Sequence, residues 1–526
     1  EVSQHLCRAC GACVQTCPVG FLKMKDLTPL KPIVMPDPFD EGLGWKKPVK
    51  IYYPQVVPRI PVIDDKACVH LNTGNCGVCQ QICGVHAINY ETVERIEEIK
   101  VGAVVLAPGG KEFEAQLRGE YGYGIYDNVI TSIQFERMLS ASGPTQGHVF
   151  RPSDHGDPKK IAWIQCVGSR DRTCGKDYCS SVCCMYASKE AVIAREHDAS
   201  VEATIFYIDL RAFGKGFDEY VTRVEEQHGI RYIRSMVSRV FEDPVTKDVT
   251  LRYIAENGDR MEESFDLVVL SVGFQIPEYT RKMAQDFGLK LDRYGFAEKS
   301  TFEPLETSRK GIFACGILNS PKDIPETVME AGGAAGAVSK YLAGARGTMT
   351  KEEEKTAEAE IAGDAGIRVG VFVCHCGKNI GGVVNVPGVA EYAKDLPNVV
   401  YATDTLYACS MDAQELLART IKEQRLNRVV VAACSPKTHE PLFQETMEAV
   451  GLNKYLFEFA NIRNHVSWVH KEEPELATEK SKDLVRMAVA KVSRAESLQE
   501  ARLDILQSAM VIGGGKEVQR VANEYQ

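Results

Sequence analysis

Cysteine placement constrains this chain more than any other feature, because sixteen of its 18 cysteines occur in groups. The first group, residues 7–18, reads C-R-A-C-G-A-C-V-Q-T-C-P. In this C-x2-C-x2-C-x3-C-P spacing, three nearby thiolates bind one [4Fe–4S] cluster, and the fourth, before Pro18, projects toward a second cluster. The run therefore predicts a small module that holds two clusters.

A second group completes this module. Cys68 is followed by a seven-residue insertion, and Gly84 stands where proline is usual. The insertion lengthens a loop but removes no ligand. Cross-ligation predicts one cluster on Cys7, Cys10, Cys13 and Cys83, and another on Cys68, Cys76, Cys79 and Cys17. Two structural zinc sites are the alternative, although zinc cysteines usually pair as C-x2–4-C with longer loops between them.

Composition excludes several other kinds of protein. The length of 526 residues suggests three or four domains of roughly 150 residues. A net charge of -10 without a long basic run gives nucleic acid no binding surface. No apolar stretch approaches the roughly 18 residues of a membrane helix. Abundant cysteine without a secretory signal predicts a reducing, cytoplasmic setting, and the first residues, Glu-Val-Ser-Gln-His, suggest that the chain begins partway through a gene product.

From Val101 onward, short apolar runs alternate with amphipathic segments, which is typical of a parallel α/β sheet. We expect a buried strand in 101–110, further strands at 161–166, 203–209 and 266–274, and a helix over 180–196. In a nicotinamide-binding domain, the first strand-to-helix turn carries G-x-G-x-x-G, so that backbone amides approach the pyrophosphate. Here cysteines take that place.

Four cysteines at this edge of the sheet predict a third [4Fe–4S] cluster instead of NAD(P): Cys166, Cys179, Cys183 and Cys184. Cys174 lies on the same loop and is the substitute ligand. The alternative is a set of buried apolar thiols, which are common in protein cores.

The run at 311–335, G-I-F-A-C-G-I-L-N-S-P-K-D-I-P-E-T-V-M-E-A-G-G-A-A, resembles the closing flavin motif of thioredoxin-reductase-like enzymes. The resemblance implies a strand that ends near the flavin ribityl chain and a helix N-terminus that faces the isoalloxazine carbonyls. The implied flavin contacts are Gly316, Asp323, Ile324 and Thr327. Ile317 replaces the usual Asp after the Gly, so we expect Asp323 to take over part of that role.

After a charged linker at 350–366, strands are expected at 369–376, 399–409, 428–434 and 454–460, with helices between them. This pattern predicts a small doubly wound domain. Four cysteines fall at or near the carboxyl ends of these strands: Cys374, Cys376, Cys409 and Cys434. Parallel pairing would gather them at one edge. One more cluster and independent buried thiols are both open interpretations.

Taken together, the motifs resemble HdrA, the iron–sulfur flavoprotein of heterodisulfide reductase. The resemblance rests on the first cysteine run, I-Q-C-V-G-S-R-D with Y-C-S-S-V-C-C-M-Y, P-K-D-I-P-E-T-V, V-F-V-C-H-C-G-K-N-I and V-V-V-A-A-C-S-P-K-T-H-E-P-L-F. It covers almost all of the chain. It implies an iron–sulfur flavoprotein whose FAD takes part in electron bifurcation. The implied partners are other redox subunits of a complex, with ferredoxin or hydrogenase- or formate dehydrogenase-type electron donors.

The order of the segments suggests a piece of a tandem or fused family member. We expect a ferredoxin-like two-cluster module (1–95), the later part of a thioredoxin-reductase-like FAD and iron–sulfur domain (96–346), a linker (347–366), an α/β domain resembling the amino-terminal domain of HdrA (367–505) and the start of a second flavin fold (506–526). The ADP half of a flavin site is represented only by V-I-G-G-G at 511–515, so we expect half of an FAD site in this chain.

The expected fold class is therefore α/β: a thioredoxin-reductase-like doubly wound flavoprotein fold with a ferredoxin-like (α+β) insert for two [4Fe–4S] clusters, and a second small parallel α/β domain. The leading functional hypothesis is an oxidoreductase subunit that moves electrons between FAD and [4Fe–4S] clusters in flavin-based bifurcation or confurcation. The alternatives are an iron–sulfur relay that has lost its flavin, and an NAD(P)H-linked flavin oxidoreductase resembling the small subunit of glutamate synthase. The sequence identifies no catalytic residue.

Overall fold

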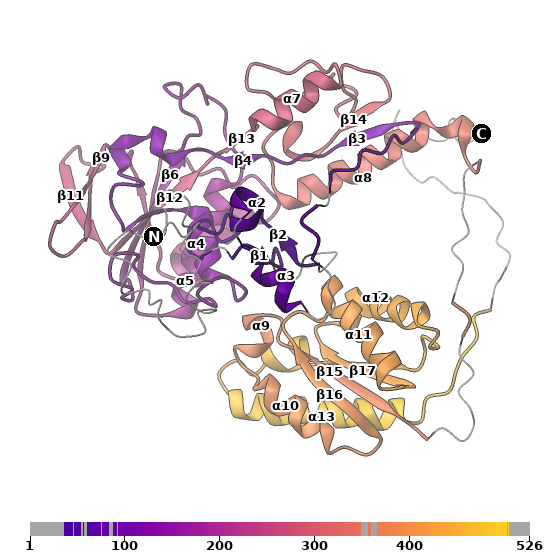
Figure 1. Ribbon diagram of the computed structural model, residues 1–526. Helices are drawn as coiled ribbons and strands as arrows, with labels where there is room; N and C mark the ends of the chain where they lie inside the picture. Colours follow the sequence, from indigo (N-terminus) through magenta and orange to yellow (C-terminus); the bar gives the residue numbers. More distant parts are fainter. Residues whose placement is uncertain are drawn as a thin grey trace, which may run out of the picture. The chain divides into compact units, whose positions relative to one another are not determined.

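The computed structural model describes residues 36–45, 47–53, 56, 60–74, 76–83, 88–91, 93–348, 356–358, 366–501 and 503. The chain divides into two compact units, one up to residue 352 and one from residue 353 (Figure 1). This division lies inside the expected linker at 347–366. The first cysteine run (Cys7, Cys10, Cys13 and Cys17) and the expected second flavin start at 506–526 lie outside the described residues.

A five-stranded parallel sheet forms the centre of the first unit, in the order β5-β12-β6-β7-β8. Its strands are β5 (Val129–Thr131), β12 (Leu267–Val272), β6 (Lys160–Val167), β7 (Glu202–Tyr207) and β8 (Arg231–Arg234). Every residue of β12 is buried, as in parallel sheets that are covered on both faces. The expected strands in 161–166, 203–209 and 266–274 are present.

Two different layers cover this sheet. On one face Trp163 and Val269 pack against helices α4 (Ser132–Leu139), α5 (Cys183–His197) and α6 (Phe217–Glu226). On the other face the core includes residues of a three-stranded antiparallel sheet, β9 (Arg239–Glu242), β10 (Val249–Ile254) and β11 (Arg260–Phe265). This architecture places the carboxyl ends of β6, β7 and β12 at one open edge.

A second, smaller sheet pairs β3 (Val104–Leu106) with β14 (Ile312–Ala314) in parallel. The expected strand in 101–110 is present as β3, but it is only partly buried: Val105 is 44% exposed, whereas Leu106 belongs to a core cluster. Among the described residues β3 pairs only with β14. The 3-10 turn η4 (Gly316–Leu318) and helix α8 (Ile324–Tyr341) follow β14.

The remaining elements of the first unit are short, apart from one helix. The helix is α7 (Glu278–Asp286), and β4 (Lys111–Glu112) pairs with β13 (Phe274–Gln275). Three 3-10 turns are η2 (Ala115–Leu117), η3 (Gly119–Tyr121) and η5 (Ala343–Ala345). The described part of the expected two-cluster module contains β1 (Val49–Lys50), β2 (Val62–Ile63), α2 (Val69–Thr73) and α3 (Val78–Ile82).

The second unit is built on a four-stranded parallel sheet in the order β16-β15-β17-β18. Its elements are β15 (Val369–Cys374), α9 (Lys378–Gly381), α10 (Val386–Lys394), β16 (Val399–Thr405), α11 (Met411–Glu423), β17 (Arg428–Ala433), α12 (Pro436–Ala449), β18 (Phe457–Asn461), the π-helix η6 (Arg463–Ser467) and α13 (Pro474–Val492). Helices α10 and α13 pack on one face of the sheet, and α11 and α12 on the other. The expected small doubly wound parallel domain is therefore present.

Candidate metal centres and flavin cavity

Strand β6 ends in an irregular turn that carries Cys166. Ile164 pairs with Leu270 but Val167 pairs with Val272, so β6 holds one residue more than β12 between these pairs. Cys166 lies in this bulge with a φ of 63°. A left-handed conformation costs a non-glycine residue on the order of 1–3 kcal/mol and persists only where the surroundings fix it, often at functional sites.

Cys179, Cys183 and Cys184 reach the same edge of the sheet from the start of α5. Cys183 and Cys184 are the first residues of this helix, and both are buried. The Ser181 backbone N–H donates to the Cys179 sulfur over 3.3 Å, and the Arg211 N–H donates to the Cys184 sulfur over 3.4 Å. Hydrogen bonds of this kind favour the thiolate form that iron binds.

The four thiols lie close enough to influence one another electrostatically. Burial, followed by negative charge on Cys184 and Cys179, raises the pKa of Cys166 to about 11, although Arg170 opposes the shift. Burial also raises the pKa of Cys183 and of Cys184. Thiolates at these buried and partly buried positions would require a positive countercharge, which the iron of a cluster would supply.

These cysteines are not arranged around a single point. Within the described parts of the chain, no three His, Cys, Asp or Glu side chains surround one point as a lone metal ion requires. A [4Fe–4S] cubane presents its iron atoms at separate corners, so its ligands are spread apart. Cys174 has a different partner: its thiol donates toward Asp171 Oδ2 over 3.5 Å. The structure therefore brings the four predicted ligands within electrostatic reach of one another, while the thiol of the predicted substitute is bonded to a carboxylate.

In the two-cluster module, three predicted ligands of one cluster surround Tyr90. Its hydroxyl lies 2.6 Å from the Cys79 sulfur. Burial, this hydrogen bond and charge on Cys68 and Cys76 raise the pKa of Tyr90 to about 12. Cys83, assigned to the other cluster, ends α3 as its C-cap. Tyr90 was not predicted as part of the site, because its spacing from the cysteines carries no recognisable signal.

In the second unit, the predicted gathering of cysteines at one sheet edge occurs. Cys374 ends β15, and Cys434 directly follows β17. The Cys374 sulfur accepts hydrogen bonds from the Ala408 N–H at 3.3 Å and from the Cys376 N–H at 3.2 Å. Charge on Cys376 raises the pKa of both Cys409 and Cys434, so all four cysteines lie within electrostatic reach of Cys376.

Arg463 adds a positive charge to this group. Its Nη1 donates to the Cys376 sulfur over 3.8 Å, and its guanidinium lies 4.6 Å from the centroid of the Trp468 ring. A hydrogen bond from Cys374, and then Arg463, lowers the pKa of Cys376 to about 6. Arg463 comes from the π-helix after β18, and no motif in the sequence marked it. Unusual helical turns of this type occur frequently at functional sites.

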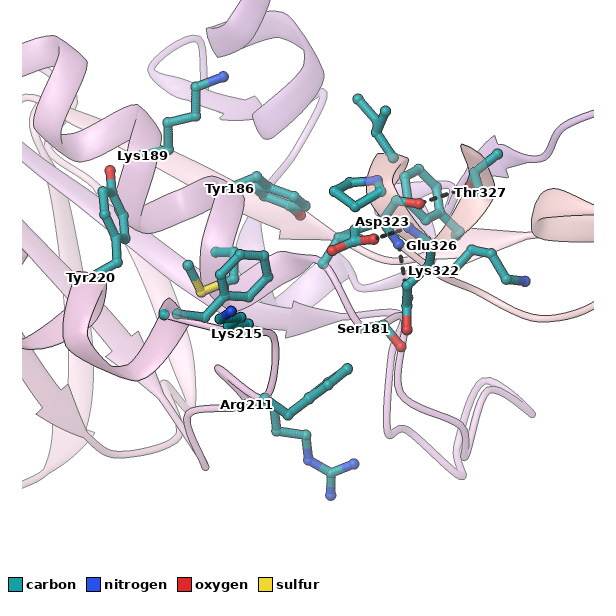
Figure 2. A pocket seen from close by; sticks show the side chains of 18 of the residues that line it. Ser181, Tyr186, Lys189, Arg211, Lys215, Tyr220, Lys322, Asp323, Glu326 and Thr327 are labelled. Carbon is teal, nitrogen blue, oxygen red and sulfur yellow. Dashed lines mark hydrogen bonds between the residues drawn. The ribbon is translucent and has the colours of Figure 1, made fainter. Parts of the chain in front are cut away.

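A cavity of about 860 Å³ lies between the start of α5 and the start of α8 (Figure 2). Its walls come from the start of α5, the segment 211–223, Phe274, Ile317 and the start of α8. Apolar side chains alternate with basic ones, and the basic set is Lys189, Arg211, Lys215, Arg223 and Lys322. A concave, mostly apolar pocket with a few convergent polar groups is typical of cofactor sites.

Three of the four predicted flavin contacts line this cavity: Asp323, Ile324 and Thr327. The Asp323 carboxylate caps α8 by accepting a hydrogen bond from the Glu326 N–H over 2.8 Å. The Thr327 hydroxyl donates to the Asp323 carbonyl over 2.7 Å. The positive end of an 18-residue helix therefore faces the cavity, which suits the electron-rich carbonyls of a flavin ring.

Gly316 lies behind this wall. It has a φ of 70°, and its N–H donates to Glu330 Oε2 over 2.8 Å. A Cβ at this position would lie 3.5 Å from the Thr327 side chain. The glycine thus lets η4 turn tightly against α8, and its placement fits a structural role in forming the cavity.

Lys322 also lines the cavity, although it is not one of the four predicted flavin contacts. Only 7% of it is exposed, and its ammonium donates to the Gly316 carbonyl over 2.8 Å. Nζ also lies 3.4 Å from Glu330 Oε2. Burial lowers the pKa of Lys322, while Glu330 opposes that shift. A buried cation beside the α8 N-terminus adds to the positive potential of the cavity.

Comparisons with known proteins agree with this architecture. Residues 59–335 match the pyridine nucleotide-disulphide oxidoreductase family, and residues 6–87 match the 4Fe–4S dicluster domain. The first match covers more than half of the chain, so the chain belongs to the pyridine nucleotide-disulphide oxidoreductase family. The two matches support iron–sulfur clusters and FAD as its cofactors, and the chain is an oxidoreductase of the iron–sulfur flavoprotein type.

Within that class, its relatives are HdrA proteins of heterodisulfide reductases. The chain is 42% identical over 346 residues to the iron–sulfur HdrA protein of the CoB–CoM heterodisulfide reductase from Methanocaldococcus jannaschii, covering 65% of this chain and 50% of that protein. It is 40% identical over 339 residues to the HdrA protein of the H2:CoB–CoM heterodisulfide,ferredoxin reductase from Methanothermobacter thermautotrophicus, covering 64% and 48%. It is 40% identical over 342 residues to the HdrA protein of the H2/formate:CoB–CoM heterodisulfide,ferredoxin reductase from Methanococcus maripaludis, covering 64% and 49%.

The chain therefore spans about half the length of the curated relatives it matches. The predicted resemblance to HdrA of heterodisulfide reductase and the predicted fold class are confirmed. The tandem arrangement stays a prediction. No described helix is both long and apolar enough to cross a membrane.

Proposed function

We propose that this chain moves electrons between FAD and [4Fe–4S] clusters in a heterodisulfide-reductase-like complex that performs flavin-based electron bifurcation or confurcation. One observation carries this proposal: the predicted cluster site and the cavity share the first turns of α5. Cys183 and Cys184 begin the helix, and the adjacent Met185 and Tyr186 line the cavity. A flavin ring in the cavity and a cluster on these cysteines would be separated by little more than one helical turn.

Different groups of this site have different proposed roles. When bound, a flavin exchanges electron pairs and [4Fe–4S] clusters exchange single electrons. Phe213, Phe274 and Ile317 give the cavity apolar walls. The α8 N-terminus and Lys322 supply positive potential for an electron-rich ring. The N–H groups of Ser181 and Arg211 hold two sulfurs in position.

The proposed ligand sets follow the cysteine groups. In the first unit they are Cys166, Cys179, Cys183 and Cys184 for one cluster; Cys68, Cys76, Cys79 and Cys17 for a second; and Cys7, Cys10, Cys13 and Cys83 for a third. In the second unit they are Cys374, Cys376, Cys409 and Cys434. Gly316, Asp323, Ile324 and Thr327 are the proposed flavin-site residues.

Partners are proposed from the names of the relatives. Those names include ferredoxin, H2 and formate as electron carriers or donors of heterodisulfide reductases. We therefore propose that this chain works with other redox subunits in the cytoplasm, and exchanges electrons with ferredoxin or with a hydrogenase- or formate dehydrogenase-type partner.

Electron flow from flavin to cluster tests this function. The assembled complex that contains this chain is purified anaerobically with its iron, sulfide and FAD, the flavin is photoreduced, and cluster reduction is followed by electron paramagnetic resonance. We expect cluster signals to appear as the flavin reoxidises. Cys184→Ser should remove one signal at unchanged FAD content, whereas Cys174→Ser should keep all of them. The proposal fails if Cys184→Ser and Cys174→Ser give the same spectra and rates.

A further inference from the structure

Tyr186 connects the cavity with the cysteine group. It lies three residues after Cys183 on α5, and side chains at that spacing share one face of a helix. Its ring lines the cavity (Figure 2), while its hydroxyl reaches the carboxyl end of β12. Among the described residues, it is the one aromatic side chain of the cavity whose hydroxyl shares a hydrogen-bonding partner with a cysteine of this group.

The hydroxyl of Tyr186 and the thiol of Cys183 meet at the same carbonyl. Tyr186 Oη donates to the Val272 oxygen over 2.9 Å, and the Cys183 sulfur lies 3.8 Å from that oxygen. The Ser132 hydroxyl donates to Tyr186 Oη over 3.3 Å. Tyr186 Oη and the Cys183 sulfur are thus neighbours at this carbonyl, and the phenol is close enough to influence the charge of the thiol. The phenol proton therefore has two acceptors within reach.

Iron binding changes the balance between these acceptors. A cysteine that ligates iron has lost its proton, so Cys183 can then only accept. A hydrogen bond to a charged acceptor is roughly twice as strong as one between neutral groups. The phenol proton therefore favours the sulfur over the Val272 carbonyl once iron is bound. Ser132 continues to donate to the phenol oxygen, so Tyr186 keeps both of its roles as donor and acceptor.

We propose that Tyr186 is a positioning residue that donates a hydrogen bond to the Cys183 thiolate and thereby sets the potential of the cluster facing the cavity. This inference rests on the proposed function, because it requires a cluster on Cys183. A donor at a ligating sulfur stabilises the more negatively charged, reduced form of a cluster. Tyr186 therefore raises the midpoint potential of this cluster. The cluster then becomes a better acceptor of electrons from a flavin in the cavity.

Tyr186→Phe tests the inference, because it keeps the ring and removes only the hydroxyl. At a fixed potential we expect the oxidised-to-reduced ratio of this cluster to rise about tenfold, a downward shift of about 59 mV for a one-electron couple. Tyr232→Phe is the matched control: its hydroxyl lies 2.8 Å from Ser188 Oγ, also on α5. This control should leave the potential unchanged.

Two readouts separate the possible outcomes. Iron and sulfide content must first show the cluster in the unmodified protein; its absence there, rather than in a variant, defeats the proposed function. With the cluster present, an exchangeable-proton coupling in pulsed electron paramagnetic resonance should disappear in Tyr186→Phe. An unchanged potential and coupling in that variant, or an equal shift in Tyr232→Phe, overturns the role of Tyr186.

Discussion

Arg463 Nη1 donates a hydrogen bond to the sulfur of Cys376 over 3.8 Å, although 86 residues lie between them in the sequence. Cys376 has a φ of 47°, so the chain holds the donor and the acceptor together at the cost of a left-handed backbone. The same guanidinium influences Cys409 and Cys434. One cation thus faces most of the cysteine group in the second unit.

We therefore expect Arg463→Gln to lower the potential of a cluster held by this group. A positive charge near a cluster stabilises its reduced form, and removal of that charge favours the oxidised form. A redox titration followed by electron paramagnetic resonance measures the shift. Arg486→Gln, which removes an exposed arginine on α13 paired with Asp483, is the control. Equal potentials in the two variants would show that Arg463 has no electrostatic role.

A second prediction concerns pH and the buried carboxyl of Glu190. This residue is 2% exposed and accepts a hydrogen bond from Trp163 Nε1 over 2.9 Å. Burial raises its pKa well above the usual value. Above about pH 4.5, the unfolded chain loses this proton while the folded protein keeps it. The contribution of Glu190 to the free energy of unfolding is therefore greatest below that pH, and it falls as the pH rises toward the folded-state pKa.

Glu190→Gln should remove this contribution, because the amide is neutral at every pH and its oxygen can still accept from Trp163. We expect the variant to lose less stability than the unmodified protein between pH 5 and pH 8, by up to about 1.4 kcal/mol per pH unit below the folded-state pKa. Thermal unfolding midpoints at both pH values measure this. Glu196→Gln, at an exposed site on the same helix, should retain the original pH dependence.

A third prediction concerns the turn after Cys166. Gly168 has a φ of 66°, and a Cβ there would lie 2.0 Å from the ring of the buried Phe113. We expect Gly168→Ala to destabilise the first unit by about 3 kcal/mol, from backbone strain and overpacking, and to reduce iron content. Gly175→Ala is matched: its φ is 64°, but a Cβ there meets nothing within 4 Å. It should cost only about 1 kcal/mol, so equal losses would contradict the steric explanation.

A fourth prediction separates flavin binding from helix stability. Ile324 is 80% exposed and lines the cavity at the first position of α8. An aspartate there suits the helix dipole but repels an electron-rich ring. We expect Ile324→Asp to keep the melting temperature and to weaken FAD binding by the assembled complex about tenfold, or 1.4 kcal/mol, as measured by quenching of flavin fluorescence. Val328→Asp, one turn further along α8, should bind FAD normally.

Cysteine spacing and apolar periodicity together predicted much of this molecule. The strand pattern placed Cys374 and Cys434 at one edge because parallel strands end together, and the structure has that edge. Arg463 and Tyr90 could not be predicted, because a side chain that meets a sulfur from another element leaves no local spacing. Lys322 and Tyr186 lie inside recognised motifs, but their contacts with the Gly316 and Val272 carbonyls depend on how the elements pack. The burial of β3 was mispredicted because an apolar run does not show how many neighbours a strand has.

The two cysteine groups differ in how much of the chain must fold before they form. Cys166 to Cys184 span a single strand-to-helix connection, whereas Cys374 to Cys434 require β15, β16 and β17 to be paired already. Closing a loop over a longer stretch of chain costs more entropy and takes longer. If the proposed ligand sets bind iron, the first unit would capture it early, during formation of one connection. The second unit would capture iron only after its sheet has formed, and iron bound there would link three strands and oppose their unfolding.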